Sequence, residues 1–297
     1  MPIGGGHMRI IFIAMALALI GQPAWAQFGF GLDKFCSTPG PSERRIKACS
    51  QLLRDDLSIA RQGYYYNRAL AYLEMGDLDH GIADLTNAIA EIDDEHHQAE
   101  RVYLAGVVLT RGKAYMDKGN IDLAMRDISQ SIALTSRQIT QYSDNSETYA
   151  AYAGRASAYL LKGEYTKSLA DAMKAVEIYP ADIYALETRA SVYEKLDRYD
   201  DAIADYNQAI AASPDADLYN NRAWAYHLKG EDANGLPDVM KSLEINPKNA
   251  PALETRGEIY EKLSKRDAAI ADYRAALAGE PTMQPAKDGL ARLGATP

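Results

Sequence analysis

The side chains that could carry out chemistry are few in this 297-residue chain. The chain contains five histidines, and the only adjacent pair follows an acidic residue in Glu95-His96-His97. Neighbouring residues on a helix do not share a face, which makes this triplet a poor metal site. A glycine-rich phosphate loop, a nucleophile elbow and an HExxH motif are missing from the sequence. We therefore expect a protein that is not an enzyme and that uses no catalytic residue, metal or cofactor.

The two cysteines, Cys36 and Cys49, are the other reactive groups. Their spacing is not the CxxC of a redox-active pair. In an oxidising compartment an isolated pair of this kind favours a structural disulfide. The alternative is two unlinked thiols, one of them buried on a helix expected from Ser42 to about Leu57.

The first 26 residues have the layout of a secretory signal peptide. The run Ile10 to Ile20 is apolar, follows Arg9 and precedes the small-residue triplet Ala24-Trp25-Ala26, whether translation begins at Met1 or Met8. The run is shorter than the roughly 20 apolar residues that cross a bilayer. We expect residues 1–26 to be removed, no membrane span in the mature chain, and a periplasmic location.

The chain is acidic, with a formal net charge of −9 at pH 7. Because nucleic acids and anionic membrane surfaces attract basic stripes, this charge argues against both as partners. The charge does not identify a partner.

The elements that must position any functional side chain are visible in the stretch from Ile183 to Asp215. The stretch contains two short amphipathic helices, separated at Asp197-Arg198 and ended by Pro214. The same pattern occurs six times. One such hairpin cannot bury its own apolar face, so the copies must stack on one another.

The recurring residues resemble those of the tetratricopeptide repeat family. Each first helix carries a small residue and a tyrosine (Ala69 and Tyr72 in the first copy, Ala190 and Tyr193 in the fourth), and the last four copies end near a proline. The resemblance implies an all-α fold, a right-handed α-solenoid of units of about 34 residues. The implied units are 62–95, 105–138, 149–182, 183–215, 216–249 and 250–283. An N-terminal loop and capping helix (27–61) and a C-terminal capping helix (284–297) would cover the ends.

Two regions depart from the regular pattern. The first two copies lack the terminal proline and are spaced more widely, so we expect their helices to be longer, adding His96 to Thr110 before one helix and Thr135 to Gln141 after another. Pro237 stands where a regular copy would already be helical. Since proline is tolerated only in the first turn of a helix, we expect this helix to begin late, near Gly235 or Leu236.

One charged pair recurs in every copy, an arginine on the first helix and an aspartate on the second. Antiparallel packing would bring the two within reach, and a guanidinium can bind a carboxylate through two hydrogen bonds. We expect semi-buried ion pairs that hold the register; a row of ligand-binding arginines is the alternative. The pairs are Arg68 and Asp84, Arg111 and Asp127, Arg155 and Asp171, Arg189 and Asp205, Arg222 and Asp238, and Arg256 and Asp272.

The resemblance also implies a binding groove along the first helices, where family members hold peptides or protein segments. Exposed aromatic residues and methionine suit such a face, although neighbouring helices could cover several of them. The implied groove positions are Tyr66, Leu70, Leu73, Met116, Leu160, Tyr184, Glu187, Glu194, Trp224, Glu254, Glu258 and Glu261.

These expectations favour a non-enzymatic scaffold of the cell envelope that binds a peptide or protein segment in its groove. The alternative is a structural or assembly subunit of an outer-membrane, secretion or pilus complex that uses its outer face or its ends. The acidic C-terminal half suits a basic or neutral segment.

Overall fold

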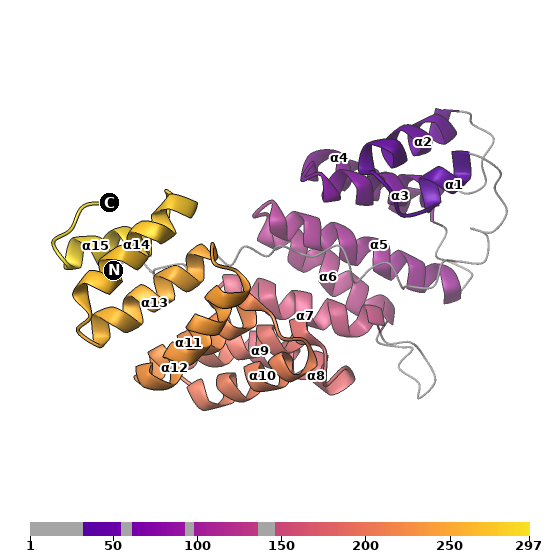
Figure 1. Ribbon diagram of the computed structural model, residues 1–297. Coiled ribbons are helices and arrows are strands. Elements are labelled where there is room, and N and C mark those ends of the chain that lie inside the picture. The colour runs from indigo at the N-terminus through magenta and orange to yellow at the C-terminus, as the bar shows by residue number, and fades with distance from the viewer. Residues whose placement is uncertain (1–31, 55–60, 93–97, 136–145) are drawn as a thin grey trace. The chain divides into compact units, whose positions relative to one another are not determined.

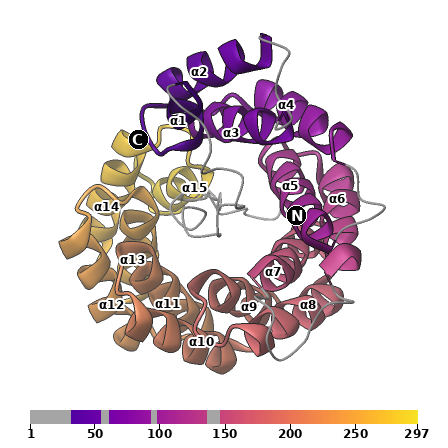
Figure 2. The same ribbon diagram turned by 90° about the vertical axis from the view of Figure 1, so that its right-hand side faces the viewer.

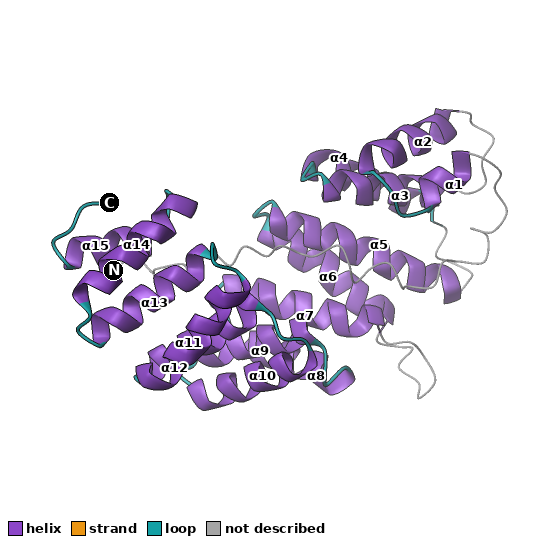
Figure 3. Cartoon of the chain, viewed as in Figure 1, coloured by secondary structure: helices purple, strands orange, loops and turns teal. Residues whose placement is uncertain are grey.

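The computed structural model describes residues 32–54, 61–92, 98–135 and 146–297, and all of its regular structure is α-helical (Figures 1 and 3). The expected signal peptide, the Glu95-His96-His97 triplet and the extension from Ser136 to Gln141 lie outside the described residues. The described chain divides into two compact parts, an N-terminal unit up to Gly163 and a C-terminal unit from Glu164 onward.

The N-terminal unit consists of seven helices, each packed against the next. They are α1 (Leu32–Ser37), α2 (Ser42–Arg54), α3 (Arg61–Glu74), α4 (Leu78–Ala90), α5 (Gln98–Asp117), α6 (Ile121–Thr135) and α7 (Ser146–Leu161). The first helix of the second repeat is extended at its start, as expected, since α5 has 20 residues and begins at Gln98. Its core includes Leu85, Val107 and Ile128, each at most 1% exposed.

The C-terminal unit consists of eight helices that also stack in chain order. They are α8 (Tyr165–Ile178), α9 (Ile183–Lys195), α10 (Tyr199–Ala212), α11 (Ala216–Lys229), α12 (Asp232–Ile245), α13 (Ala250–Lys262), α14 (Arg266–Gly279) and α15 (Gln284–Arg292). The first helices of three successive repeats (α9, α11 and α13) and the capping helix α15 also form a row in which each contacts the next. Figure 2 shows α11 and α13 along one side of this unit and α12 and α14 along the other.

Local sequence signals set where these helices begin and turn. Asp182, Asp215 and Asn249 are N-caps whose side chains accept hydrogen bonds from the backbone N–H three residues later, which satisfies donors that a helix start leaves unpaired. The turn inside each of the six full repeats contains one residue with a left-handed backbone. Glycine supplies it in four hairpins, whereas Asp197 (φ 56°) and Ser264 (φ 59°) supply it in the other two.

The helix around Pro237 differs from our expectation of a late start. Helix α12 begins at Asp232 and contains Pro237 in its interior. Because proline has no backbone N–H, the carbonyl of Ala233, four residues earlier, lacks its helical hydrogen bond. Ala233 is exposed. Gly235 holds this turn against α11, because a Cβ there would lie 2.8 Å from the Ala223 carbonyl oxygen. Packing of the helix pair therefore outweighs the helix-breaking tendency of proline.

The N-terminus also differs from expectation, because a helix replaces part of the predicted loop. Helix α1 and helix α2 form a short hairpin joined by a disulfide between Cys36 and Cys49, whose Cα atoms are 4.9 Å apart. Helices α2 and α4 have the same length, and Cys49 occupies the position of the core residue Leu85. Both residues are fully buried. Helices α1 and α2 thus resemble one more repeat with a shortened first helix.

Candidate functional site

The recurring arginines and aspartates form ion pairs within the hairpins. In five pairs the arginine Nε and Nη2 atoms donate to the two carboxylate oxygens of the aspartate at 2.6–3.1 Å. The aspartate side chains are at most 11% exposed, and the arginine side chains at most 24%. In the sixth pair, Arg155 lies in the N-terminal unit and Asp171 in the C-terminal unit, so this pair stays a prediction. The five arginines are thus engaged in holding the hairpins together.

The third guanidinium nitrogen, Nη1, links successive repeats. In four repeats it donates to a polar side chain on the second helix of the preceding hairpin, at 2.7–3.5 Å. The bonds run from Arg68 to Ser50, from Arg111 to Thr86, from Arg155 to Ser129 and from Arg222 to Asn207. Because Ser50 lies on α2, this helix takes the place of the second helix of a preceding repeat for the first full repeat. Arg68, Arg111 and Arg222 therefore each join three helices.

The predicted groove residues of the N-terminal unit mostly pack against other helices. Met116 is only 5% exposed and belongs to a core cluster, so its prediction as a groove residue is wrong. Its position faces inward because α5 packs against both α6 and α7. The Tyr66 ring packs edge-on against Tyr103 with centroids 5.9 Å apart. Leu73 packs against the core, while Leu70 and Leu160 are partly exposed.

The C-terminal unit keeps its predicted groove residues partly exposed on the first helices. Tyr184, Glu187 and Glu194 lie on α9, Trp224 lies on α11, and Glu254, Glu258 and Glu261 lie on α13. We call these seven residues the first-helix face. The Trp224 ring lies 5.1 Å from the ring of His227, whose Nδ1 pairs with Asp232 at 2.6 Å. The face is therefore acidic and carries two aromatic residues, Tyr184 on α9 and Trp224 on the middle helix α11.

Three glutamates of this face are held in surroundings that disfavour their charged forms. Burial raises the pKa of Glu187 and Glu194 to about 7, and burial with the neighbouring Glu258 raises the pKa of Glu254 to about 8. The Glu187 carboxylate accepts a long hydrogen bond from the Asn221 amide at 3.4 Å. These carboxyl groups would be stabilised as anions by a cation brought to the face.

Helix α15 supplies such a cation at the end of the face. The Arg292 guanidinium donates to Glu258 at 2.7 Å and to both carboxylate oxygens of Glu261 at 3.0 and 2.9 Å. Arg292 lowers the pKa of Glu261 through these bonds. Reasoning from the sequence does not identify Arg292 as part of the face, because its contacts with Glu258 and Glu261 arise only where α15 packs against α13.

The Glu254→Gln variant is expected to raise the thermal midpoint of unfolding at pH 8 and to change it little at pH 5. The pKa of Glu254 is about 8 in the folded chain against an ordinary value of 4.5. Between these values the folded chain holds a proton that the unfolded chain releases, so stability falls as the pH rises. Each unit of difference corresponds to about 1.4 kcal/mol.

Thermal melts from pH 5 to pH 8 measure this effect. Glu244→Gln, an exposed glutamate on α12, is the matched control and should leave the pH dependence unchanged. An equal pH dependence in wild type and Glu254→Gln would contradict the assignment.

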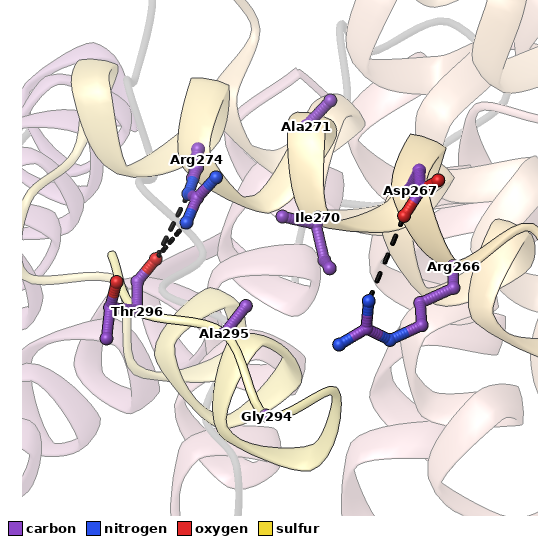
Figure 4. Close-up of a pocket in the computed structure, with 8 residues that line it drawn as sticks. All are labelled: Arg266, Asp267, Ile270, Ala271, Arg274, Gly294, Ala295 and Thr296. Atoms are coloured by element: carbon purple, nitrogen blue, oxygen red, sulfur yellow. Dashed lines mark hydrogen bonds and ion pairs between the residues drawn. The ribbon is translucent and has the colours of Figure 1, made fainter.

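A separate hollow of about 520 Å³ lies between α14 and the chain end (Figure 4). Arg274 donates to the carbonyl of Thr296 at 3.0 and 2.9 Å, and Arg266 lies 3.9 Å from Asp267. The hollow is shallow and open. Arg274 on α14 binds the Thr296 carbonyl and so holds the last residues against this helix. We therefore assign the hollow a structural role.

The described residues contain no group of three or more His, Cys, Asp or Glu side chains that could hold a metal ion. Among the same residues, no helix is both long and apolar enough to cross a membrane.

Comparison with known proteins identifies the family. Models described as "Tetratricopeptide repeat" match residues 109–183 and 188–251, and residues 63–92 and 250–281. Together they cover more than half of the chain, which therefore belongs to the tetratricopeptide repeat family. A chain of such repeats is a scaffold for protein–protein interaction, and members of the family are in general not enzymes.

Individual relatives agree with this placement. The chain is 27% identical over 246 residues to the Hsp70-Hsp90 organizing protein of Triticum aestivum, covering 80% of this chain and 38% of that protein. It is 35% identical over 95 residues to sperm-associated antigen 1 of Mus musculus, covering 32% of this chain and 10% of that protein. The chain thus spans well under half the length of these relatives.

Solved structures show the same fold. A tetratricopeptide repeat protein from Parabacteroides merdae aligns with a TM-score of 0.63 at 18% identity, over 85% of this chain and 92% of that one. A chain of the APC/C hetero-tetramer Cut9–Hcn1 aligns with a TM-score of 0.67 at 14% identity, over 88% of this chain and 48% of that one.

Proposed function

We propose that the protein is a non-enzymatic scaffold of the cell envelope that holds a segment of another protein against the first-helix face of its C-terminal unit. The observation that carries this proposal is the character of that face. It combines one partly exposed tryptophan, Trp224, with glutamates whose charge is poorly solvated. Aromatic anchors surrounded by polar groups are typical of protein-binding surfaces.

The location in the envelope is part of the proposal and rests on different residues. The apolar run from Ile10 to Ile20 and the Ala24-Trp25-Ala26 triplet support export by a cleaved signal peptide. The disulfide between Cys36 and Cys49 agrees with an oxidising compartment such as the periplasm.

The Trp224→Ala variant is expected to reduce the amount of partner recovered with the protein from the periplasmic fraction by about tenfold or more. The expectation follows because truncating a central aromatic anchor typically costs at least about 2 kcal/mol of binding free energy. Affinity purification with quantitative mass spectrometry measures the loss.

Met240→Ala is the matched control, because Met240 is 52% exposed on α12, a second helix of the same unit. The proposal requires that this variant keep its partner. If Met240→Ala lost the partner while Trp224→Ala kept it, the outer face would be the binding surface. The role of a structural or assembly subunit would then replace the proposed one.

A further inference from the structure

Two repeats of the C-terminal unit carry the same glutamate–tyrosine pair behind the first-helix face. Counted from the N-caps of their helices, Glu194 and Glu261 occupy one position, and Tyr206 and Tyr273 occupy another. The Tyr206 hydroxyl donates to Glu194 at 3.1 Å, and the Tyr273 hydroxyl donates to Glu261 at 3.0 Å. Both tyrosines are at most 1% exposed. The intervening repeat has His227 and Val239 at these positions, so it lacks the pair.

The later copy of the pair is occupied by an arginine of the same chain. The guanidinium of Arg292 binds both oxygens of Glu261, reaches Glu258 at 2.7 Å and lies 3.4 Å from the Tyr273 hydroxyl. A planar guanidinium can satisfy several acceptors at once, which a lysine ammonium does less well. The arrangement shows which ligand chemistry this pair accepts.

The earlier pair, Glu194 and Tyr206, has the same acceptor atoms but no arginine of the described chain bound to them. Trp224 stands on α11 at the position that Arg292 holds on α15, counted from the N-cap of each helix. Among the described residues Glu194 forms no ion pair, although the neighbouring Lys195 lies close enough to lower its pKa. Asn220 lies one turn before Trp224 on the same side of α11. It is 7% exposed, and its Oδ1 atom has no hydrogen-bond donor.

We propose that Glu194, Tyr206, Trp224 and Asn220 form a binding site for an arginine side chain of the partner segment. This inference rests on the proposed function and adds the chemistry of the partner. The guanidinium would pair with the Glu194 carboxylate, donate to Asn220 Oδ1 and stack on the Trp224 ring, which is the aromatic side chain that binds cations best. The site offers one carboxylate where Arg292 meets two, because Ser191 replaces Glu258.

The test uses a fluorescein-labelled hexa-arginine peptide, with hexa-lysine and hexa-glutamate peptides for comparison, and measures fluorescence anisotropy with the full chain. We expect Glu194→Gln to weaken binding of the hexa-arginine peptide by about tenfold or more, the usual loss for a hydrogen-bonded charge. Tyr206→Phe should weaken it less. Hexa-lysine should bind more weakly than hexa-arginine, and hexa-glutamate should not bind.

Glu244→Gln removes the same charge from an exposed position of the same unit and should change the affinity less than about twofold, since surface charges act weakly. Binding should also change the emission of Trp224, an effect that Trp224→Phe removes; Trp25 is the only other tryptophan. Circular dichroism verifies that each variant is folded.

Equal affinities of Glu194→Gln and Glu244→Gln would overturn the inference, because binding would then reflect net charge alone. Failure of the wild type to bind hexa-arginine would overturn it as well. Neither result would touch the proposed function, which is tested separately by the recovery of the protein partner with Trp224→Ala and Met240→Ala.

Discussion

The Asp205→Ala variant should lower the free energy of unfolding of the C-terminal unit by about 3–5 kcal/mol, the usual cost of leaving a buried charge without its partner. Asp205 accepts hydrogen bonds from Arg189 at 2.8 and 2.6 Å. The two side chains are 6% and 19% exposed. Once the carboxylate is removed, the guanidinium remains between helices without a counter-charge. Urea unfolding followed by circular dichroism measures the loss.

Asp201→Ala is the control for this experiment. Asp201 also lies on α10 and pairs with Arg198, but both side chains are 48% exposed, so its removal should cost less than about 1 kcal/mol. Replacing both members of the buried pair, as in Arg189→Met with Asp205→Leu, should recover much of the stability because no charge is left unpaired. Near-wild-type stability of Asp205→Ala would show that the pairs do not hold the hairpins together.

Removing the disulfide should lower the stability of the N-terminal unit by about 3 kcal/mol, because a loop of this size then regains its freedom in the unfolded chain. The double variant Cys36→Ala with Cys49→Ala tests this without placing hydroxyl groups in the core, where both cysteines are at most 1% exposed. Hydrogen exchange of α1 and α2 should increase most. Exchange of α13 and α14, in the other unit, is the internal reference.

Wild-type protein treated with a thiol reductant should reproduce the behaviour of the double variant. Identical exchange rates of α1 and α2 before and after reduction would contradict a stabilising role for the disulfide.

Much of the fold could be predicted from the sequence because each hairpin repeats the same local signals. Apolar periodicity, the small residues between helices and the turn residues all act within about 34 residues. The exceptions arise where contacts between elements decide. The short helix α1 has too few residues to show a period, and Gly235 keeps α12 continuous through Pro237 by packing against α11.

The positions of the candidate-site residues along their helices could be predicted from the sequence, but their contacts could not. The positions of Glu194, Trp224 and Glu261 on their helices follow from the repeat pattern. The burial of Met116 and the contact between Arg292 and Glu261 depend on how neighbouring helices meet. The repetition of a glutamate on the first helix with a tyrosine on the second, in the fourth and sixth repeats, was the available sign of the arginine-binding arrangement.

The arginine Nη1 bonds bear on how unfolding spreads along the chain. In a repeat array, stability is approximately a sum of repeat terms and nearest-neighbour terms. In four repeats the arginine Nη1 bond to the preceding hairpin contributes to the free energy of the interface between neighbouring repeats. Among the described residues, Arg189 and Arg256 make no such bond, and the matching positions are Met173 and Met240, each 52% exposed. Cooperativity should therefore be weakest where α9 follows α8 and where α13 follows α12, and partly unfolded forms should break at these two junctions first.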